Sequence, residues 1–195
     1  MIITLTGFMG CGKSSVGRKL SELLCCPFID LDEAVEAKTG KSIAEIFEED
    51  GEAAFRSLEL ESLKGILCEE SHVSDMLSQK IFEGDTAVVL ALGGGTVMTE
   101  ECAEIVRKNT CCIYLKASVD TLTKRLSDET DSRPLLATSS QEAERCDDLR
   151  NRVEAILAQR KETYEKTANI IIDTDGKSIE DIASEISQNV ANTPL

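Results

Sequence analysis

Histidine, tryptophan and basic residues are the scarce components of this chain. It contains one histidine (His72) and no tryptophan, and aromatic residues make up 4% of its 195 residues. A core must therefore be built from Leu, Ile, Val and Ala, and the lack of any Cys-x-x-Cys pair argues against a zinc site. The 21 basic residues against 36 acidic ones give a net charge of −15. This balance argues against nucleic acid and anionic membranes as general partners.

Long hydrophobic runs are also missing. None approaches the length of a membrane span, and we see no signal peptide before the first predicted strand. The eight cysteines lie mostly among apolar residues, as small core side chains do. We therefore expect a cytoplasmic protein with reduced thiols. Its length and its 42% hydrophobic content fit one domain over residues 1–195.

The first fifteen residues contain the clearest motif. Met1–Thr6 is a short apolar, β-branched run that predicts a buried strand, and a helical pattern starts near Lys13. Between them, Gly7–Ser14 reads G-x-x-x-x-G-K-S, the phosphate loop of nucleotide-binding proteins. The alternative is an ordinary glycine-rich turn. The residues expected to bind a nucleotide are Gly10, Cys11, Gly12, Lys13, Ser14 and Ser15.

Each residue type in this loop has a chemical reason. Glycines allow the backbone N–H groups to converge on phosphate oxygens at the positive end of a helix dipole. Lys13 is expected to bridge the β- and γ-phosphates, and the Ser14 hydroxyl is expected to bind Mg²⁺.

Short apolar runs alternate with helical patterns along the whole chain. This alternation predicts an α/β three-layer domain, with a parallel sheet covered by helices on both faces. The expected strands are Met1–Thr6, Pro27–Asp30, Ala87–Leu92, Cys111–Leu115 and Asn169–Ile172.

Three stretches depart from the alternation. Residues 42–68 predict two helices broken near Asp50-Gly51, inserted beside the sheet. Residues 69–85 predict a loop or an irregular helix. Residues 128–141 are polar and include Arg133-Pro134, as expected of a lid over a site.

Besides the strand before the phosphate loop, two predicted strands end in polar or glycine-rich residues, where ligands collect in a parallel sheet. Asp30 and Asp32 would point the same way in extended geometry, one toward a Mg²⁺-bound water and the other toward an acceptor hydroxyl. Alternatively, one of them caps a helix. Gly93–Gly95 either lets the backbone approach a ligand closely or forms a plain turn.

Several other side chains have open alternatives. Arg56, Arg133 and Arg160 are ligand-binding groups or solvated surface residues. Arg125 lies along adenine or stabilises a helix C-terminus. Glu59 orients Arg56 or forms a surface ion pair with it. Two aromatics line an acceptor pocket or belong to the core: Phe47 and Phe55.

Together these motifs resemble the shikimate kinase family, from Met1 to about Ile186. The phosphate loop alone would indicate only an NTPase, whereas the combination in this order and spacing is specific. The matching stretches are Gly7–Ser14, Asp30-Leu31-Asp32, Thr39–Phe47, Phe55-Arg56 with Glu59, Gly93–Gly95, Arg133-Pro134-Leu135-Leu136, and Arg160 with Tyr164.

The resemblance implies a P-loop domain like that of the nucleoside monophosphate kinases, with a five-stranded parallel sheet of order 2-3-1-4-5. It implies transfer of the γ-phosphoryl group of ATP to the 3-hydroxyl of shikimate, in aromatic amino-acid biosynthesis, by a monomer that uses Mg²⁺. Residues 32–70 would form the substrate-binding helical insertion and 128–141 the lid. The remaining rival functions are a related small-molecule kinase, such as gluconate kinase, and a catalytically silent binding domain.

The resemblance also implies a role for each site residue. Shikimate would be bound by Asp32, Arg56, Gly93, Gly94, Gly95 and Arg160. Lys13, Asp32 and Arg133 would be catalytic, and Arg125 and Arg133 would contact ATP. Mg²⁺ would be held by Ser14 and, through water, by Asp30. Two departures from the family pattern are the missing proline in Lys161–Tyr164 and the length of residues 69–86.

Overall fold

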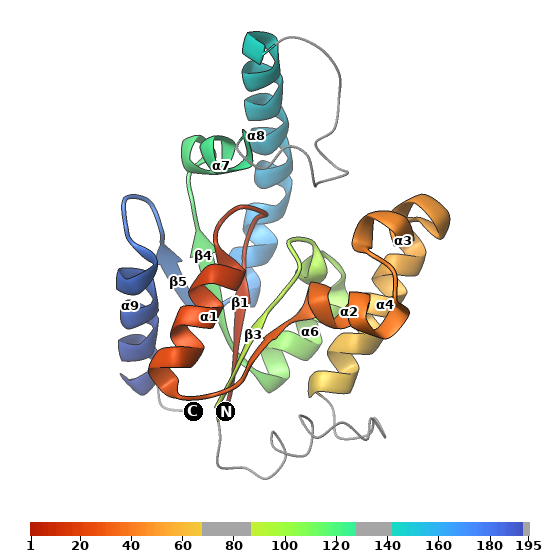
Figure 1. The fold of residues 1–195 in the computed structure, drawn as a ribbon. Coiled ribbons are helices and arrows are strands. Elements are labelled where there is room, and N and C mark those ends of the chain that lie inside the picture. Colours follow the sequence, from red (N-terminus) through yellow and green to blue (C-terminus); the bar gives the residue numbers. More distant parts are fainter. Residues whose placement is uncertain (68–86, 128–141, 193–195) are drawn as a thin grey trace.

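A computed structural model describes residues 1–67, 87–127 and 142–192 (Figure 1). Its centre is a five-stranded parallel sheet of order β2-β3-β1-β4-β5, which confirms the predicted topology. The strands lie within two residues of the predicted bounds at each end. They are β1 Ile2–Thr6, β2 Phe28–Asp30, β3 Val88–Ala91, β4 Cys111–Lys116 and β5 Ile170–Asp173.

The two faces of the sheet carry separate cores because side chains alternate along each strand. Ile3 and Leu5 of β1 belong to the core under α1 (Lys13–Leu24) and α9 (Ile179–Asn192). These two helices pack side by side in Figure 1. The opposite core contains Leu90 of β3 and is covered by α4 (Gly51–Leu67), α6 (Glu100–Asn109) and the C-terminal part of α8 (Glu142–Thr167). The helix α7 (Val119–Ser127) packs against α8.

The expected insertion follows β2 and consists of helices. It contains α2 (Leu31–Thr39), α3 (Ile43–Glu49) and α4, and the last two are broken at Asp50, as predicted. Gly51 takes a φ of 81° at this break, a conformation that favours glycine. A small core of its own, formed by Val35, Ile46 and Phe55, holds the three helices together. The insertion is therefore a packed unit beside the carboxyl end of β2.

Two predicted segments, 69–85 and the lid at 128–141 with Arg133, lie outside the described residues. Within the described ranges, no helix is both long and apolar enough to cross a membrane.

Candidate active site

The phosphate loop joins β1 to α1 and has the backbone conformation that its glycines permit. Gly10 and Gly12 have φ angles of 78° and 98°, which few other residues adopt, and Gly12 directly precedes the first turn of α1. The Lys13 ammonium donates to the carbonyl oxygens of Gly7 (2.9 Å) and Phe8 (3.1 Å). Lys13 thus lies against the loop, at the positive end of the α1 dipole.

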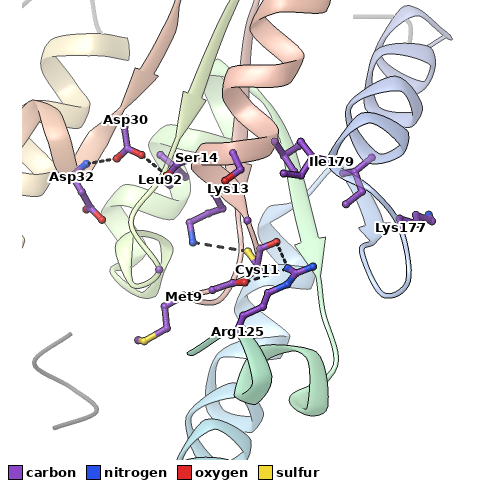
Figure 2. Close-up of a pocket in the computed structure, with 16 residues that line it drawn as sticks. Met9, Cys11, Lys13, Ser14, Asp30, Asp32, Leu92, Arg125, Lys177 and Ile179 are labelled. Atoms are coloured by element: carbon purple, nitrogen blue, oxygen red, sulfur yellow. Dashed lines mark hydrogen bonds between the residues drawn. The ribbon is translucent and has the colours of Figure 1, made fainter. Parts of the chain in front are cut away.

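Arg125 of α7 is attached to the same loop. Its Nη1 donates to the carbonyl oxygens of Gly10 and Cys11, both at 3.2 Å (Figure 2). The guanidinium therefore contacts the phosphate loop. These hydrogen bonds do not involve the C-terminal carbonyls of α7, its own helix. Contact with adenine stays a prediction.

Asp30 links the phosphate loop to the helical insertion. Its Oδ2 accepts a hydrogen bond from the Ser14 hydroxyl at 2.6 Å, and its Oδ1 accepts from the backbone N–H of Asp32 at 3.1 Å (Figure 2). The second bond makes Asp30 the N-cap of α2. The same side chain thus caps a helix and faces the Ser14 hydroxyl.

Asp32 lies in the first turn of α2, so the expected extended geometry of the Asp pair is wrong. The helix begins at Leu31 because Asp30 caps it, yet both carboxylates still line one cavity. Burial and the negative charge of Asp30 raise the pKa of Asp32 to about 6, although Lys13 lowers it. The pKa of Asp32 thus lies about two units above that of an ordinary aspartate and closer to neutral pH.

The Gly93–Gly95 segment between β3 and the short 3-10 helix η1 (Thr96–Met98) is the close-approach point of the site. A Cβ on Gly93 would lie 2.8 Å from both Asp32 Oδ1 and Glu59 Oε1. A Cβ on Gly95 would lie 2.6 Å from Arg56 Nη2. The segment forms a turn, closed by a hydrogen bond from the Thr96 N–H to the Gly93 carbonyl oxygen, and a side chain at Gly93 or Gly95 would displace these groups. Close approach of a ligand to this backbone stays a prediction.

Helix α8 packs against the middle glycine. Arg160 Nη1 and the Tyr164 hydroxyl both donate to the Gly94 carbonyl oxygen, at 3.2 and 2.5 Å. Tyr164 is fully buried and stacks on Tyr114 of β4, with ring centroids 5.1 Å apart. The helix runs unbroken to Thr167, past the position before Tyr164 at which this chain lacks the family's proline.

The Arg56–Glu59 pair of α4 lies in the same place. Arg56 Nη1 donates to Glu59 Oε2 at 2.9 Å, and Nη2 donates to Glu52 at 3.1 Å. Glu59 is fully buried, which excludes the surface ion pair and supports an orienting role. Phe55 packs in the core of the insertion beside Phe47, with ring centroids 4.9 Å apart, so its pocket alternative is wrong.

The phosphate loop and the Asp30–Asp32 turn border a cavity of about 570 Å³, a size typical of small-molecule sites (Figure 2). The phosphate loop, Ser15, Asp30 and Asp32 line it, and Gly94 brings the triple-glycine segment to its wall. Three lining residues from the start of α9 and the loop before it were not predicted: Lys177, Ile179 and Ile182. The signal for them was their position after the last strand, at the ligand-binding edge of a parallel sheet.

The oxygen groups of the cavity suit a hard cation. Among the residues that the structure describes, no group of three His, Cys, Asp or Glu side chains could hold a metal ion. Mg²⁺ commonly uses one or two protein oxygens together with phosphate and water. The Ser14 hydroxyl and the Asp30 carboxylate, 2.6 Å apart, are two of the side-chain oxygen groups that line the cavity.

Comparisons with known proteins agree with one another. A family model described as shikimate kinase matches residues 9–191. Curated shikimate kinases of Chlorobaculum parvum and Chlorobium phaeobacteroides are 40% and 36% identical to this chain. The first match covers 97% of this chain and 91% of the relative, and the second 98% and 94%.

Solved structures give the same result. The shikimate kinase from Acinetobacter baumannii in complex with shikimate has a TM-score of 0.79 and 30% identity, over 100% of this chain and 94% of that one. The shikimate kinase from Bacteroides thetaiotaomicron has a TM-score of 0.78 and 28% identity, over 98% of both chains. Because sequence and structure match over nearly its whole length, this chain belongs to the shikimate kinase family.

Proposed function

We propose that this chain transfers the γ-phosphoryl group of ATP to the 3-hydroxyl of shikimate, a step of aromatic amino-acid biosynthesis. One observation carries the proposal beyond family membership. The phosphate loop and Asp32 share a cavity, and the glycine segment at its wall contacts the guanidinium groups of Arg56 and Arg160. A nucleotide and a small carboxylic acid would thus meet across a short gap.

The nucleotide half of the site would hold the ATP phosphates. The loop N–H groups and Lys13 neutralise phosphate charge, while Ile179 and Ile182 offer apolar surface near Arg125 for the base. Ser14 and, through water, Asp30 would hold Mg²⁺, which supplies further positive charge to the phosphates when bound. This arrangement fits phosphoryl transfer, in which positioning and charge neutralisation supply most of the rate.

The acceptor half would hold shikimate by its carboxylate and hydroxyl groups. Arg56 and Arg160 would bind the carboxylate, and the glycine segment would let the ring approach the backbone. Burial lowers the pKa of Arg56, but Glu59 and Glu52 outweigh this effect and raise it, so the guanidinium keeps its charge. Shikimate would then lie between Arg56 and Asp32.

Asp32 would face the hydroxyl that is phosphorylated. As the oxygen–phosphorus bond forms and the bond to the β–γ bridging oxygen breaks, the hydroxyl proton passes to the Asp32 carboxylate. With a pKa near 6, Asp32 is mostly ionised at neutral pH and can accept this proton. If Asp32 only orients the shikimate hydroxyl, it would accept the same hydrogen bond without taking the proton. The pH profile of kcat distinguishes this orienting role from that of a general base.

Three further proposals concern Arg133, the role of residues 32–70 and the oligomeric state. Arg133, in the 128–141 segment, would contact the transferring phosphoryl group on the resemblance to the family. Residues 32–70 would be the substrate-binding insertion of a single domain. We also propose that the protein is a cytoplasmic monomer, which size-exclusion chromatography with light scattering checks.

A coupled assay of ADP release tests the proposed function. With ATP and Mg²⁺, shikimate should stimulate ADP release and gluconate should not. If gluconate stimulates ADP release and shikimate does not, the chain is the related kinase. If neither substrate stimulates ADP release, the silent binding domain is favoured.

A further inference from the structure

Glu59 is a buried carboxylate whose two oxygens are used separately. Its side chain has no solvent exposure, and Oε2 accepts from Arg56 at 2.9 Å. Oε1 accepts from the hydroxyl of Thr96 at 2.5 Å. Thr96, at the start of η1, is itself fully buried. A buried carboxylate oxygen without a donor is costly, so Thr96 is the group that completes Glu59.

The Thr96 hydroxyl donates its hydrogen bond to Glu59 and not to the nearby Gly93 carbonyl oxygen. The hydroxyl lies 3.1 Å from the Gly93 carbonyl oxygen, but that oxygen also accepts the backbone N–H of Thr96 at 3.3 Å. The shorter distance and the negative charge on Glu59 direct the single hydroxyl proton to Oε1. Thr96 therefore joins the glycine segment to α4 through Glu59.

This contact reaches the acceptor half of the site. With Oε1 held by Thr96, Oε2 is fixed toward Arg56, whose Nη1 and Nη2 lie 2.9 and 2.6 Å from a Cβ built on Gly95. The chain of contacts runs from Thr96 to Glu59 to Arg56. None of these contacts involves the phosphate loop.

We propose that Thr96 is a positioning residue for the acceptor: it fixes Glu59, which in turn aims Arg56 at the shikimate carboxylate. This inference rests on the proposed role of Arg56. It predicts a selective effect, because the nucleotide half is untouched.

Thr96→Val removes the hydroxyl at nearly constant volume. We expect the KM for shikimate to rise about tenfold, the size of one hydrogen bond to a charged group. The KM for ATP should not change, and kcat should change less than the KM for shikimate. Thr96→Ser keeps the hydroxyl and should restore the wild-type KM. If the valine variant does not fold, Thr96→Ala tests the same loss without a branched side chain.

Thr167→Val is the matched control. Thr167 is also buried, and its hydroxyl donates to a backbone carbonyl, that of Thr163, within α8. Its substitution removes a buried hydroxyl without affecting Glu59, so it should lower the melting temperature less than Thr96→Val and leave the KM for shikimate unchanged. If both Thr96→Val and Thr167→Val raise the KM for shikimate, general destabilisation explains the increase.

Arg56→Lys separates this inference from the proposed function. If Arg56→Lys raises the KM for shikimate and folded Thr96→Val does not, the positioning role of Thr96 is wrong while the site stands. If Arg56→Lys has no effect on that KM, the proposed site itself is wrong. If Thr96→Val adds nothing further in the Arg56→Lys background, Thr96 acts through Arg56, as we propose.

Discussion

Replacing Asp32 by Asn should stabilise the protein while removing most of its activity. The pKa of Asp32 rises from 3.8 to about 6 in the folded chain, chiefly because the carboxyl is buried. The folded state therefore holds this proton more tightly than the unfolded state. The contribution of Asp32 to stability is most favourable below pH 4 and worsens as the pH rises through 6.

The magnitude follows from the size of the shift. About two pKa units correspond to about 3 kcal/mol, which the ionised carboxylate costs the folded state above pH 7. Asparagine removes this cost, but it also loses the attraction of a negative charge to the N-terminal end of α2, worth about 0.3–1 kcal/mol. A net gain of about 2 kcal/mol remains, which for a chain of this length raises Tm by about 4–8 °C.

Unfolding of the ligand-free protein measures this gain. Wild type, Asp32→Asn and the control Glu48→Gln, an exposed carboxylate of α3, are compared in urea at pH 7.5 and pH 5. At pH 5 the cost of the Asp32 charge falls to about half, so the advantage of Asp32→Asn should shrink accordingly. The control should show neither the gain nor its pH dependence. In the same variant kcat should fall by about 10²–10⁴, the usual contribution of a catalytic base.

Two outcomes would refute this reasoning. If Asp32→Asn is no more stable than wild type at pH 7.5, the carboxylate does not stay charged in a buried position. If the gain is equal at pH 7.5 and pH 5, it does not come from ionisation. In either case the raised pKa would no longer support Asp32 as the group that accepts the hydroxyl proton.

Three further substitutions test single contacts. Lys13→Ala should lower kcat by about 10²–10³, because charge on the transferred group goes unneutralised; a steady-state assay checks this, and wild-type turnover would contradict it. Arg56→Ala should weaken shikimate binding by about 2–3 kcal/mol, and an unchanged KM for shikimate would refute the assignment. Gly95→Ala should raise the KM for shikimate with little loss of Tm, because its Cβ would lie 2.6 Å from the movable end of Arg56; a large fall in Tm with normal KM would contradict the close contact.

Much of the fold could be predicted because its signals are local. A strand followed by Gly7–Ser14 and a helix defines the nucleotide end, and short apolar runs located all five strands. The bounds of the broken pair α3 and α4 followed from Asp50-Gly51. The start of α2 was less predictable, because Asp30 could cap a helix or face a bound cation; the structure shows the cap, together with a hydrogen bond from Ser14.

The contacts within the site were less predictable, since they join residues far apart in the chain. Arg125 reaches the phosphate loop across 115 residues, and Thr96 reaches Glu59 across 37. No spacing rule connects such pairs; only the order of the strands brings them together. For Lys177 the sequence offers only its position after the last strand, which marks an edge of the sheet and not a particular side chain.

The central claim is that a nucleotide loop and an acid-binding cluster face each other across one cavity. A crystal structure of this chain with ADP, Mg²⁺ and shikimate tests it most directly. The shikimate carboxylate should lie within hydrogen-bond distance of Arg56 and Arg160, with its 3-hydroxyl facing Asp32 and the ADP phosphates on the loop before α1. Shikimate bound away from these arginines, or with its carboxylate turned toward the nucleotide, would contradict the account.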